Sequence, residues 1–308
     1  MFYIPIIGAL LEASGMIIEK KIMKKKNIDY KTFTVYGFLA IVAVMFPFIF
    51  FFWNINPDLL QIKNIMIFLL IVIFALIANV LIFYSLKRET MSEFEPINMM
   101  QPLFTILIAF VFSFFLTEYA QERNPIILII ALIASVTLIA THIKRNHLVF
   151  NKYIIAALLG GFFFSIELVL TKFLLPSSTT ITFDLIKSSF TFYFLRCLII
   201  LIAAYIIFRP SFKKIDKQTH YLNWIVSVIF VVYRIILYWG YATLGIIYTT
   251  IILSILSPIF IYIFARIFLK EKITKKQIIS AIIIILCIVA AIFQGFILGL
   301  FNNILSLV

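Results

Sequence analysis

Three charged residues lie inside long apolar runs of this 308-residue chain: Glu12, Glu167 and Arg234. A charge near the middle of a membrane-spanning helix costs about 2.5 to 3.5 kcal/mol on insertion scales, so each is a candidate for function. A buried carboxylate can take up and release protons, and a buried guanidinium can bind a carboxylate or phosphate. The structural alternatives are an interhelical hydrogen bond at Glu12 and an ion pair of Arg234 with Glu12 or Glu167.

Both carboxylates share a helix face with small residues. At 3.6 residues per turn, Gly8, Glu12 and Gly15 fall on one stripe, and Gly160 and Glu167 fall on another. Small residues allow a neighbouring backbone or a ligand to approach closely. We therefore predict that Glu12 and Glu167 bind substrate and carry protons.

Neutral polar and aromatic side chains at membrane depth extend the candidate site. Tyr238 and Trp239 follow Arg234 by about one turn and give it a polar, aromatic face. The remaining substrate-binding candidates are Asn79, Tyr84 and Gln101. Each of these three, taken alone, is also typical of hydrogen bonding between helices.

Two further charged residues lie nearer to the ends of their apolar runs. Glu19 adjoins Lys20 and Lys21, which favours a structural ion pair at the end of the first helix. Arg196 is likewise expected to be structural.

The sequence lacks the patterns of several other chemistries. It contains no glycine-rich phosphate loop of the Walker type, and its three histidines lack metal-ligand spacing. Cys197 and Cys287 fall in apolar runs, which favours buried thiols over a disulfide or a zinc site. We therefore predict no metal, no cofactor and no catalytic residue, and a protein that is not an enzyme.

The composition predicts the surroundings of these residues. Hydrophobic residues make up 64% of the chain and charged residues 13%, against about a quarter in soluble domains, and the mean hydropathy is +1.15. Such a chain belongs in a lipid bilayer. Its net charge of +13 is carried mainly between the apolar runs, where it indicates topology and not nucleic-acid binding.

The predicted fold is an all-α integral membrane protein with ten transmembrane helices around a central cavity. A crossing takes about 20 residues, and only α-helices satisfy every backbone group in hydrocarbon without partner strands. The expected segments are Ile4–Ile22, Thr34–Trp53, Ile65–Leu86, Pro96–Thr117, Pro125–Ile143, Tyr153–Leu175, Phe190–Phe208, Leu222–Ala242, Ile247–Leu269 and Gln277–Leu298.

The ten segments form an internal duplication. Pro102–Glu118 and Pro258–Glu271 share one pattern, and Met16–Lys20 matches Leu168–Lys172. A basic loop around residue 145 divides the chain into repeats 1–146 and 147–308, which together make one membrane domain. Because each repeat has five crossings, the second must run in the opposite sense, so the repeat is inverted.

The distribution of basic residues predicts the orientation. The odd-numbered loops carry nineteen lysines and arginines, whereas the even-numbered loops carry four. By the positive-inside rule, the odd loops lie in the cytoplasm and both termini outside.

The residues also carry a family resemblance. The end of the first helix, Ile18–Lys21, and the passage Pro258–Glu271 resemble the EamA-type transporters of the drug/metabolite transporter superfamily, over Gly8 to about Phe296. Gly8–Gly15 is also similar to the first helix of the small multidrug resistance transporters, and this resemblance marks Glu12 as a proton- and cation-binding residue. The resemblance implies a secondary transporter with alternating access.

We therefore predict a secondary active transporter of the cytoplasmic membrane. It would move a small metabolite, such as an amino acid, or a drug, by export coupled to protons or by exchange. Its partners would be the small-molecule substrate and membrane lipid, without nucleic acid, and it would be a monomer or homodimer. The alternatives are a lipid flippase or scramblase of the same fold, and a membrane enzyme acting on lipid.

Overall fold

The computed structural model describes residues 3–25, 28–55, 57–89, 94, 97–98, 100–142, 151–175, 183–212, 215–268 and 275–293. In these residues all regular secondary structure is helical, and there is no strand. The α-helices, in chain order, are α1 (Tyr3–Met23), α2 (Tyr30–Met45), α3 (Ile49–Phe52), α4 (Ile62–Arg88), α6 (Met100–Ser113), α7 (Pro125–His142), α8 (Lys152–Leu174), α9 (Phe183–Phe208), α10 (Lys217–Thr243), α11 (Ile246–Ile252), α12 (Ser257–Phe268) and α13 (Lys275–Ile292). Short 3-10 helices are η1 (Phe46–Phe48), η2 (Pro57–Leu60) and η3 (Thr117–Arg123).

Several of these helices have the length and composition of membrane spans. Within the described residues, six helical spans qualify, or seven if α6 and η3, which are bent by 117°, count as one broken span. Pro125–Thr137 and Ala281–Phe293 are shorter apolar helices. The helix α1 carries Glu12, Glu19 and Lys20, so its composition is less apolar. The all-helical, multi-pass prediction is confirmed, whereas the number ten is not established.

Two predicted segments are interrupted. Thr34–Trp53 consists of α2, η1 and α3, with Pro47 inside η1. Ile247–Leu269 consists of α11 and α12, separated by a turn at Leu253–Leu256. In this turn the Ile255 N–H bonds to the Thr250 carbonyl, and Pro258 has no N–H to continue the helical pattern. A hydropathy pattern does not register such breaks, because the turn residues are as apolar as the helices.

Local sequence signals set the starts of several helices. The Asp29 carboxylate accepts the Thr32 N–H at 2.7 Å and caps α2, and the Asn151 side chain accepts the N–H groups of Tyr153 and Ile154 and caps α8. Between α10 and α11 the chain turns at Gly245, whose φ of 91° favours glycine.

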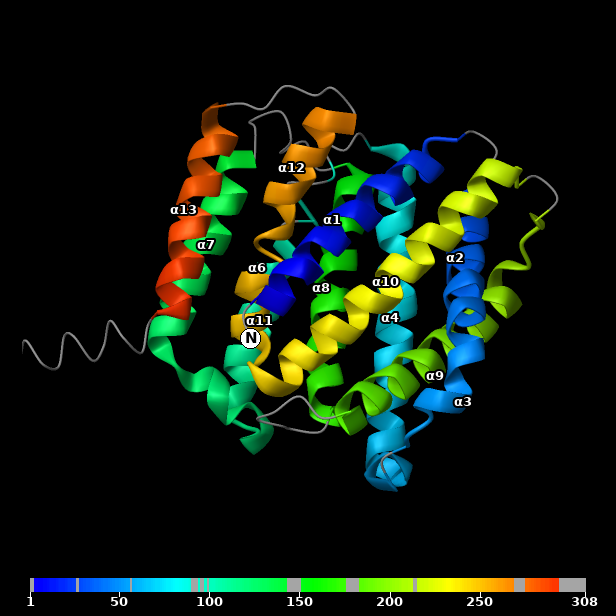
Figure 1. Ribbon diagram of the computed structural model, residues 1–308, viewed down its shortest axis with the longest axis horizontal. Coiled ribbons are helices and arrows are strands. Elements are labelled where there is room, and N and C mark those ends of the chain that lie inside the picture. Colours follow the sequence, from blue (N-terminus) through cyan, green and yellow to red (C-terminus); the bar gives the residue numbers. More distant parts are fainter. Residues whose placement is uncertain are drawn as a thin grey trace, which may run out of the picture.

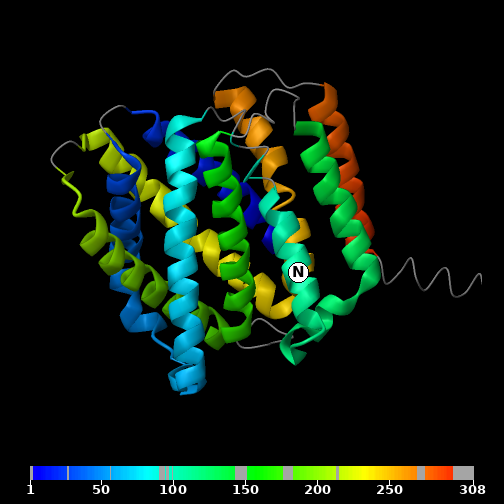
Figure 2. The ribbon, with the colours of Figure 1, turned by 180° about the vertical axis from the view of Figure 1, so that it is seen from behind.

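The helices are arranged in contacting pairs. At one edge α7 packs against α13, and towards the opposite edge α2 packs against α9 (Figure 1). Between these edges, α1 packs against α10, while α4 packs against α8 on the other side of the molecule (Figure 2). In addition, α1 contacts α12 and α6 contacts α8. In a chain of two repeats, α1 corresponds to α8 and α4 corresponds to α10. The contact between α1 and α10 is therefore the counterpart of the contact between α8 and α4.

Two glycines allow the central pairs to pack closely. A Cβ on Gly8 would lie 3.0 Å from Cγ2 of Ile236 in α10, and a Cβ on Gly160 would lie 2.9 Å from Cγ1 of Ile82 in α4. Both distances are shorter than ordinary contacts, so the crossings need glycine. Because residue 160 follows residue 8 by the same interval that relates Met16 to Leu168, the duplication is visible in the packing.

Two buried lysines repeat the same arrangement. Lys20 Nζ donates to the carbonyls of Leu86 and Glu89 at 2.7 and 2.6 Å, at the end of α4. Lys172 Nζ donates to the Tyr241 carbonyl at 2.6 Å, near the end of α10. A cation at a helix C-terminus satisfies carbonyls that lack intrahelical partners. These lysines therefore tie α1 to α4 and α8 to α10.

Candidate functional site

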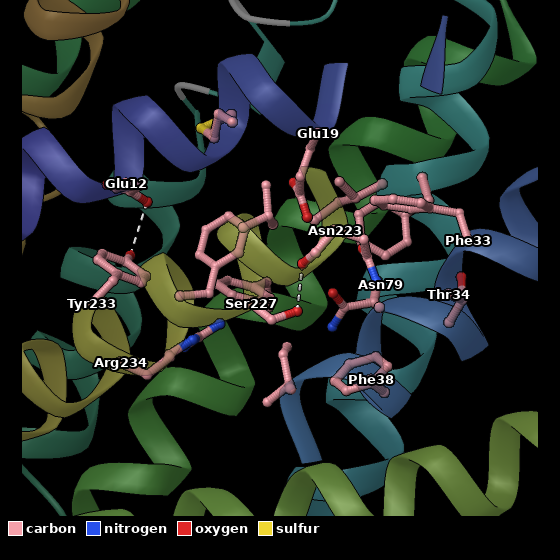
Figure 3. A pocket seen from close by; sticks show the side chains of 18 of the residues that line it. Glu12, Glu19, Phe33, Thr34, Phe38, Asn79, Asn223, Ser227, Tyr233 and Arg234 are labelled. Carbon is pink, nitrogen blue, oxygen red and sulfur yellow. Dashed lines mark hydrogen bonds between the residues drawn. The ribbon is translucent and has the colours of Figure 1, made fainter. Parts of the chain in front are cut away.

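A central cavity lies between the two middle pairs of helices. Its volume is about 130 Å³. The helices α1, α2, α4, α6, α8, α9 and α10 contribute residues to its walls, some of which are drawn in Figure 3. Phenylalanines supply much of the apolar lining: Phe33, Phe38, Phe83, Phe164 and Phe230. The polar lining comprises Glu12, Glu19, Thr34, Asn79, Asn98, Gln101, Tyr193, Arg196, Asn223, Ser227, Tyr233 and Arg234. This mixture suits a small organic solute with an apolar body and polar groups.

A buried ion-pair cluster joins α8, α9 and α10 beside the cavity. Glu167 Oε1 lies 3.0 Å from Arg196 Nη2, and Glu167 Oε2 lies 4.0 Å from Arg234 Nη1. The Glu167 side chain is fully buried. It also accepts a hydrogen bond from Thr171 at 3.2 Å, and Arg196 Nη1 donates to the Tyr238 hydroxyl at 2.9 Å. One carboxylate therefore balances two guanidinium groups, and one positive charge is left over.

Arg234 is the less satisfied of the two arginines. Its Nη1 is buried without a hydrogen-bond partner among the described residues. The guanidinium lies over the ring of Phe164, 4.7 Å from the centroid, and over Tyr233 at 5.8 Å. These aromatic faces hold the planar group in position through cation–π attraction without using its N–H donors. Because Arg234 also lines the cavity, it can donate to an anionic group there.

Glu12 faces the same cavity from α1. Its Oε1 accepts a hydrogen bond from the Tyr233 hydroxyl at 2.8 Å (Figure 3). Gly15, one turn further along α1, faces Phe230, whose ring would lie 2.8 Å from an added Cβ. The glycines on the stripe of Glu12 therefore leave room for side chains of α10.

The structure brings together most of the residues predicted to bind substrate. Glu12, Asn79, Gln101 and Arg234 line the cavity. Glu167 and Tyr238 lie behind this lining and contact its arginines. The role of all six residues in substrate binding stays a prediction.

Two candidates lie elsewhere. Tyr84 packs edge-on against Tyr30 and is tilted against Tyr153, with centroids 5.2 and 5.1 Å away. Trp239 is buried in a cluster with Leu185 and Ala242. Sequence reasoning selected Tyr84 as a polar group at membrane depth and Trp239 as a neighbour of Arg234. Neither criterion shows which side of the helix faces the cavity.

Several cavity residues were not singled out. Glu19 was assigned to an ion pair, yet its carboxylate lines the cavity and has no hydrogen bond or ion pair among the described residues. The sequence carried a signal, since Glu19 lies seven residues after Glu12. In α10, Asn223, Ser227 and Tyr233 were also missed, although Asn223, Ser227 and Arg234 recur at intervals of four and seven residues, which places them on one face.

One comparison with known proteins gives the family of the molecule, and another gives its fold. A sequence model of the EamA-like transporter family matches residues 1–141 and 151–293. No curated protein sequence matches the chain at a significant level. Among solved structures, one titled "Crystal structure of protein" superposes with a TM-score of 0.68 at 12% identity, covering 94% of this chain and 95% of its own. At that identity the likeness concerns the fold alone.

Proposed function

This chain belongs to the EamA-like transporter family, and from that membership and the cavity we infer a secondary active transporter of a small organic solute that bears an anionic group. It is a multi-pass membrane protein. The solute would bind between the repeats and reach each side of the membrane by alternating access. Arg234 would bind the anionic group, and Glu12 would carry the coupling proton.

The observation that carries this proposal is the incomplete pairing of Arg234. Glu167 is shared between Arg196 at 3.0 Å and Arg234 at 4.0 Å, and at the longer contact Arg234 Nη1 has no hydrogen-bond partner among the described residues, in a side chain that lines the cavity. An anionic group that accepts from Arg234 would complete the charge balance of the cluster. The phenylalanines of the wall would contact the apolar part of the solute.

The charge of Glu12 would link proton binding to the binding of the solute. Its carboxylate lines the cavity that Arg234 lines, and it is joined to Arg234 through the adjacent Tyr233. When Glu12 is ionised, its negative charge disfavours a second anion nearby, and when it is protonated that repulsion is absent. Proton binding at Glu12 and solute binding at Arg234 are then linked.

We also propose the remaining topology: ten crossings as an inverted five-plus-five repeat in the cytoplasmic membrane. The lysine-rich ends support it. Lys87 Nζ donates to the carbonyls of Met23 and Lys25, and Lys25 pairs with Asp216 at 2.9 Å, so the ends of α1, α4 and α10 meet on one side. Both repeats lie in one chain, so a monomer would suffice to form the cavity.

A binding screen on the purified protein tests the substrate class. Solutes with a carboxylate are compared with matched neutral amides by thermal shift, for the wild type and for Arg234→Gln. We expect stabilisation by at least one carboxylate, a weaker effect of its amide, and a loss in Arg234→Gln that Arg266→Gln, an exposed arginine on α12, does not share. Equal binding of both solute classes to all three proteins would contradict the assignment of Arg234.

A further inference from the structure

The central cavity occupies one half of the helix bundle. In α10 its lining ends at Arg234, although the helix continues to Thr243, and in α4 its lining begins at Asn79, although the helix starts at Ile62. Both limits place the cavity nearer to the lysine-rich ends of α1, α4 and α10. We call that side of the bundle proximal, and we call the opposite side, where α4 begins, α10 ends and η3 lies, distal (Figures 1 and 2).

The distal half of the bundle is packed. Every residue of α11 is buried, and so are Tyr238 and Tyr241 near the end of α10 and Lys172 near the end of α8. In the described part of the chain, these helices separate the central cavity from the distal side.

Two side chains of η3 join the first repeat to the second in this packed half. Glu122 is 3% exposed, and its carboxylate oxygens accept the N–H groups of Ile246 and Ile247 in α11 at 2.6 and 3.0 Å. Tyr119 is fully buried, and its hydroxyl donates to the Val169 carbonyl in α8 at 2.7 Å. Both contacts therefore cross from one repeat to the other.

A buried lysine brings the opposite charge to the same place. Lys172 is 2% exposed, donates to the Tyr241 carbonyl at 2.6 Å and interacts electrostatically with Glu122. The turn at Gly245 leaves room for the carboxylate, since a Cβ on this glycine would lie 2.8 Å from Glu122 Oε1. A carboxylate and an ammonium group are thus buried together where α8, α10, α11 and η3 meet.

Buried charges of this kind suit a contact that opens and closes. While it is closed, each charge is balanced by the other and by hydrogen bonds, and when it opens, water hydrates both charges and recovers the cost of their burial. The separation of an apolar interface has no such compensation. On the proximal side the described ion pair between the repeats, Lys25 with Asp216, is instead 26% and 54% exposed.

We propose that Glu122, Lys172 and Tyr119 form the distal gate of this protein. Their contacts are made in the conformation described, and they must separate before a solute passes between the central cavity and the distal side. This inference rests on the proposed function, because alternating access requires each side of the cavity to close in turn.

Thiol labelling from each side of the membrane tests the gate in the full-length protein. Cys197 and Cys287 are replaced by alanine, and Thr250, which is 1% exposed and lies beside Tyr241, is replaced by cysteine as the reporter. A membrane-impermeant reagent is added to right-side-out and to inverted membrane vesicles, and labelling of Leu60→Cys in η2 identifies the preparation that presents the distal side. With the gate intact, we expect slow distal labelling of the reporter.

Three gate variants and one matched control locate the effect. Glu122→Gln and Lys172→Met should each speed distal labelling about tenfold, because a charge-assisted contact of the closed state is lost. Tyr119→Phe keeps the ring and removes one hydrogen bond, so it should give a smaller increase and tests the gate even if the charge variants do not fold. Glu118→Gln makes the same charge change at an exposed residue of η3 and should keep the original rate. Unchanged labelling in the gate variants, or equal acceleration in the control, would overturn the proposal.

A bulky side chain in the cavity distinguishes gate opening from local loosening of α11. Gly37 in α2 lines the central cavity, and an added Cβ there meets nothing within 4 Å. The proximal half must close when the distal half opens, so Gly37→Trp, which obstructs that closure, should return distal labelling of the reporter in Glu122→Gln towards the original rate. Loosening of α11 alone would not respond to a side chain on α2. Undiminished labelling in the combined Gly37→Trp, Glu122→Gln protein would therefore contradict the gate.

The gate and the proposed function fail separately. Solute flux in liposomes, together with reporter labelling that ignores Glu122, Lys172 and Tyr119, would remove the gate and leave the transporter assignment intact. Reporter labelling that follows these residues and Gly37→Trp, in a protein that moves no solute, would support the gate and contradict the proposed function.

Discussion

At the scale of single residues, the centre of the protein is organised by Glu167. Its buried carboxylate lies 3.0 Å from Arg196 and 4.0 Å from Arg234, and it accepts a hydrogen bond from Thr171. Arg196 in turn donates to Tyr238. The charges and hydrogen-bonding groups of these side chains are therefore balanced by one another. The cluster holds Arg234 in position at the cavity.

Removal of the Glu167 charge tests this dependence. In Glu167→Gln two buried guanidinium groups lose their counter-ion, and a broken buried pair typically costs about 3 to 5 kcal/mol. We expect a clear fall in Tm of the purified protein. The contrasting variant is Asp216→Asn, which removes an exposed ion pair with Lys25 and should leave Tm nearly unchanged at neutral pH. Equal effects of the two would contradict the account of Glu167.

The pH response of Asp216 follows from its partners. The Thr219 hydroxyl and the Lys25 ammonium group lower the pKa of this carboxyl to about 2 from 3.8. A lowered folded-state pKa gives stability that is present above the unfolded value and lost as the pH falls through the folded one. The difference in the free energy of unfolding between wild type and Asp216→Asn should therefore be constant near neutral pH. As the pH falls from about 4 to about 2, this difference should decrease to zero. Urea unfolding at stepped pH measures it.

The sequence allowed part of the site to be predicted. Charge inside an apolar run is rare enough that Glu12, Glu167 and Arg234 stood out, and the structure places all three in or beside one cavity. Tyr84 and Trp239 are not among the residues that line that cavity, and sequence alone does not separate them from the lining, because neutral aromatics occur on every helix face. Asn223 was missed because a single amide near a helix start has an ordinary appearance, and only its register with Arg234 distinguishes it.

At the scale of elements, close helix crossings hold the two repeats together. Gly160 in α8 faces Ile82 in α4, with the backbone carbonyl of Ala78 only 3.3 Å from an added Cβ. Gly8 in α1 makes the matching approach to α10. The helix α11 has a different anchor: the Glu122 carboxylate accepts the N–H groups of Ile246 and Ile247 at 2.6 and 3.0 Å.

A bulkier residue at Gly160 should force α4 and α8 apart. Gly160→Val is expected to lower stability by about 1 to 3 kcal/mol, because backbone atoms cannot move aside as a flexible side chain can. The control is Gly37→Ala in α2, where an added Cβ meets nothing within 4 Å. That variant should be as stable as wild type or slightly more so. Thermal unfolding in detergent compares them, and a tolerated Gly160→Val would contradict the close crossing.

The capping of α11 gives a second test at this scale. Glu122 is 3% exposed, so its loss leaves two N–H groups at the start of α11 without their acceptor. Glu122→Ala should cost about 1 to 3 kcal/mol and increase hydrogen exchange in residues 246–252 more than in α4. Unchanged exchange in α11 would show that other groups hold its start. Sequence analysis did not foresee this contact, because Glu122 and Ile246 are far apart in the chain.

At the scale of the whole molecule, the lysine-rich ends of α1, α4 and α10 meet on one side of the bundle. Composition and periodicity were sufficient to predict an all-helical, duplicated membrane protein, because burial in lipid constrains every segment in the same way. They were insufficient for the breaks at η1 and between α11 and α12, which depend on single prolines and turn geometry.

Accessibility of single cysteines tests the orientation of the molecule. Cys197 and Cys287 are first replaced by alanine, and one cysteine is introduced at Lys24, after α1, or at Leu60, in η2. Both positions are exposed. In intact cells, a membrane-impermeant thiol reagent should label the Leu60→Cys protein but label the Lys24→Cys protein only after lysis. The opposite pattern would reverse the proposed orientation.

The central claim is that a solute with an anionic group crosses the membrane through the cavity, held by Arg234. Its most direct test is flux of the best carboxylate solute in liposomes with an enclosed pH dye, in both directions of the proton gradient. We predict solute flux accompanied by proton movement in the wild type and in Arg266→Gln, and a roughly 10- to 100-fold loss of kcat/KM in Arg234→Gln, the loss expected for a charge-assisted hydrogen bond. Wild-type flux through a folded Arg234→Gln protein would contradict it.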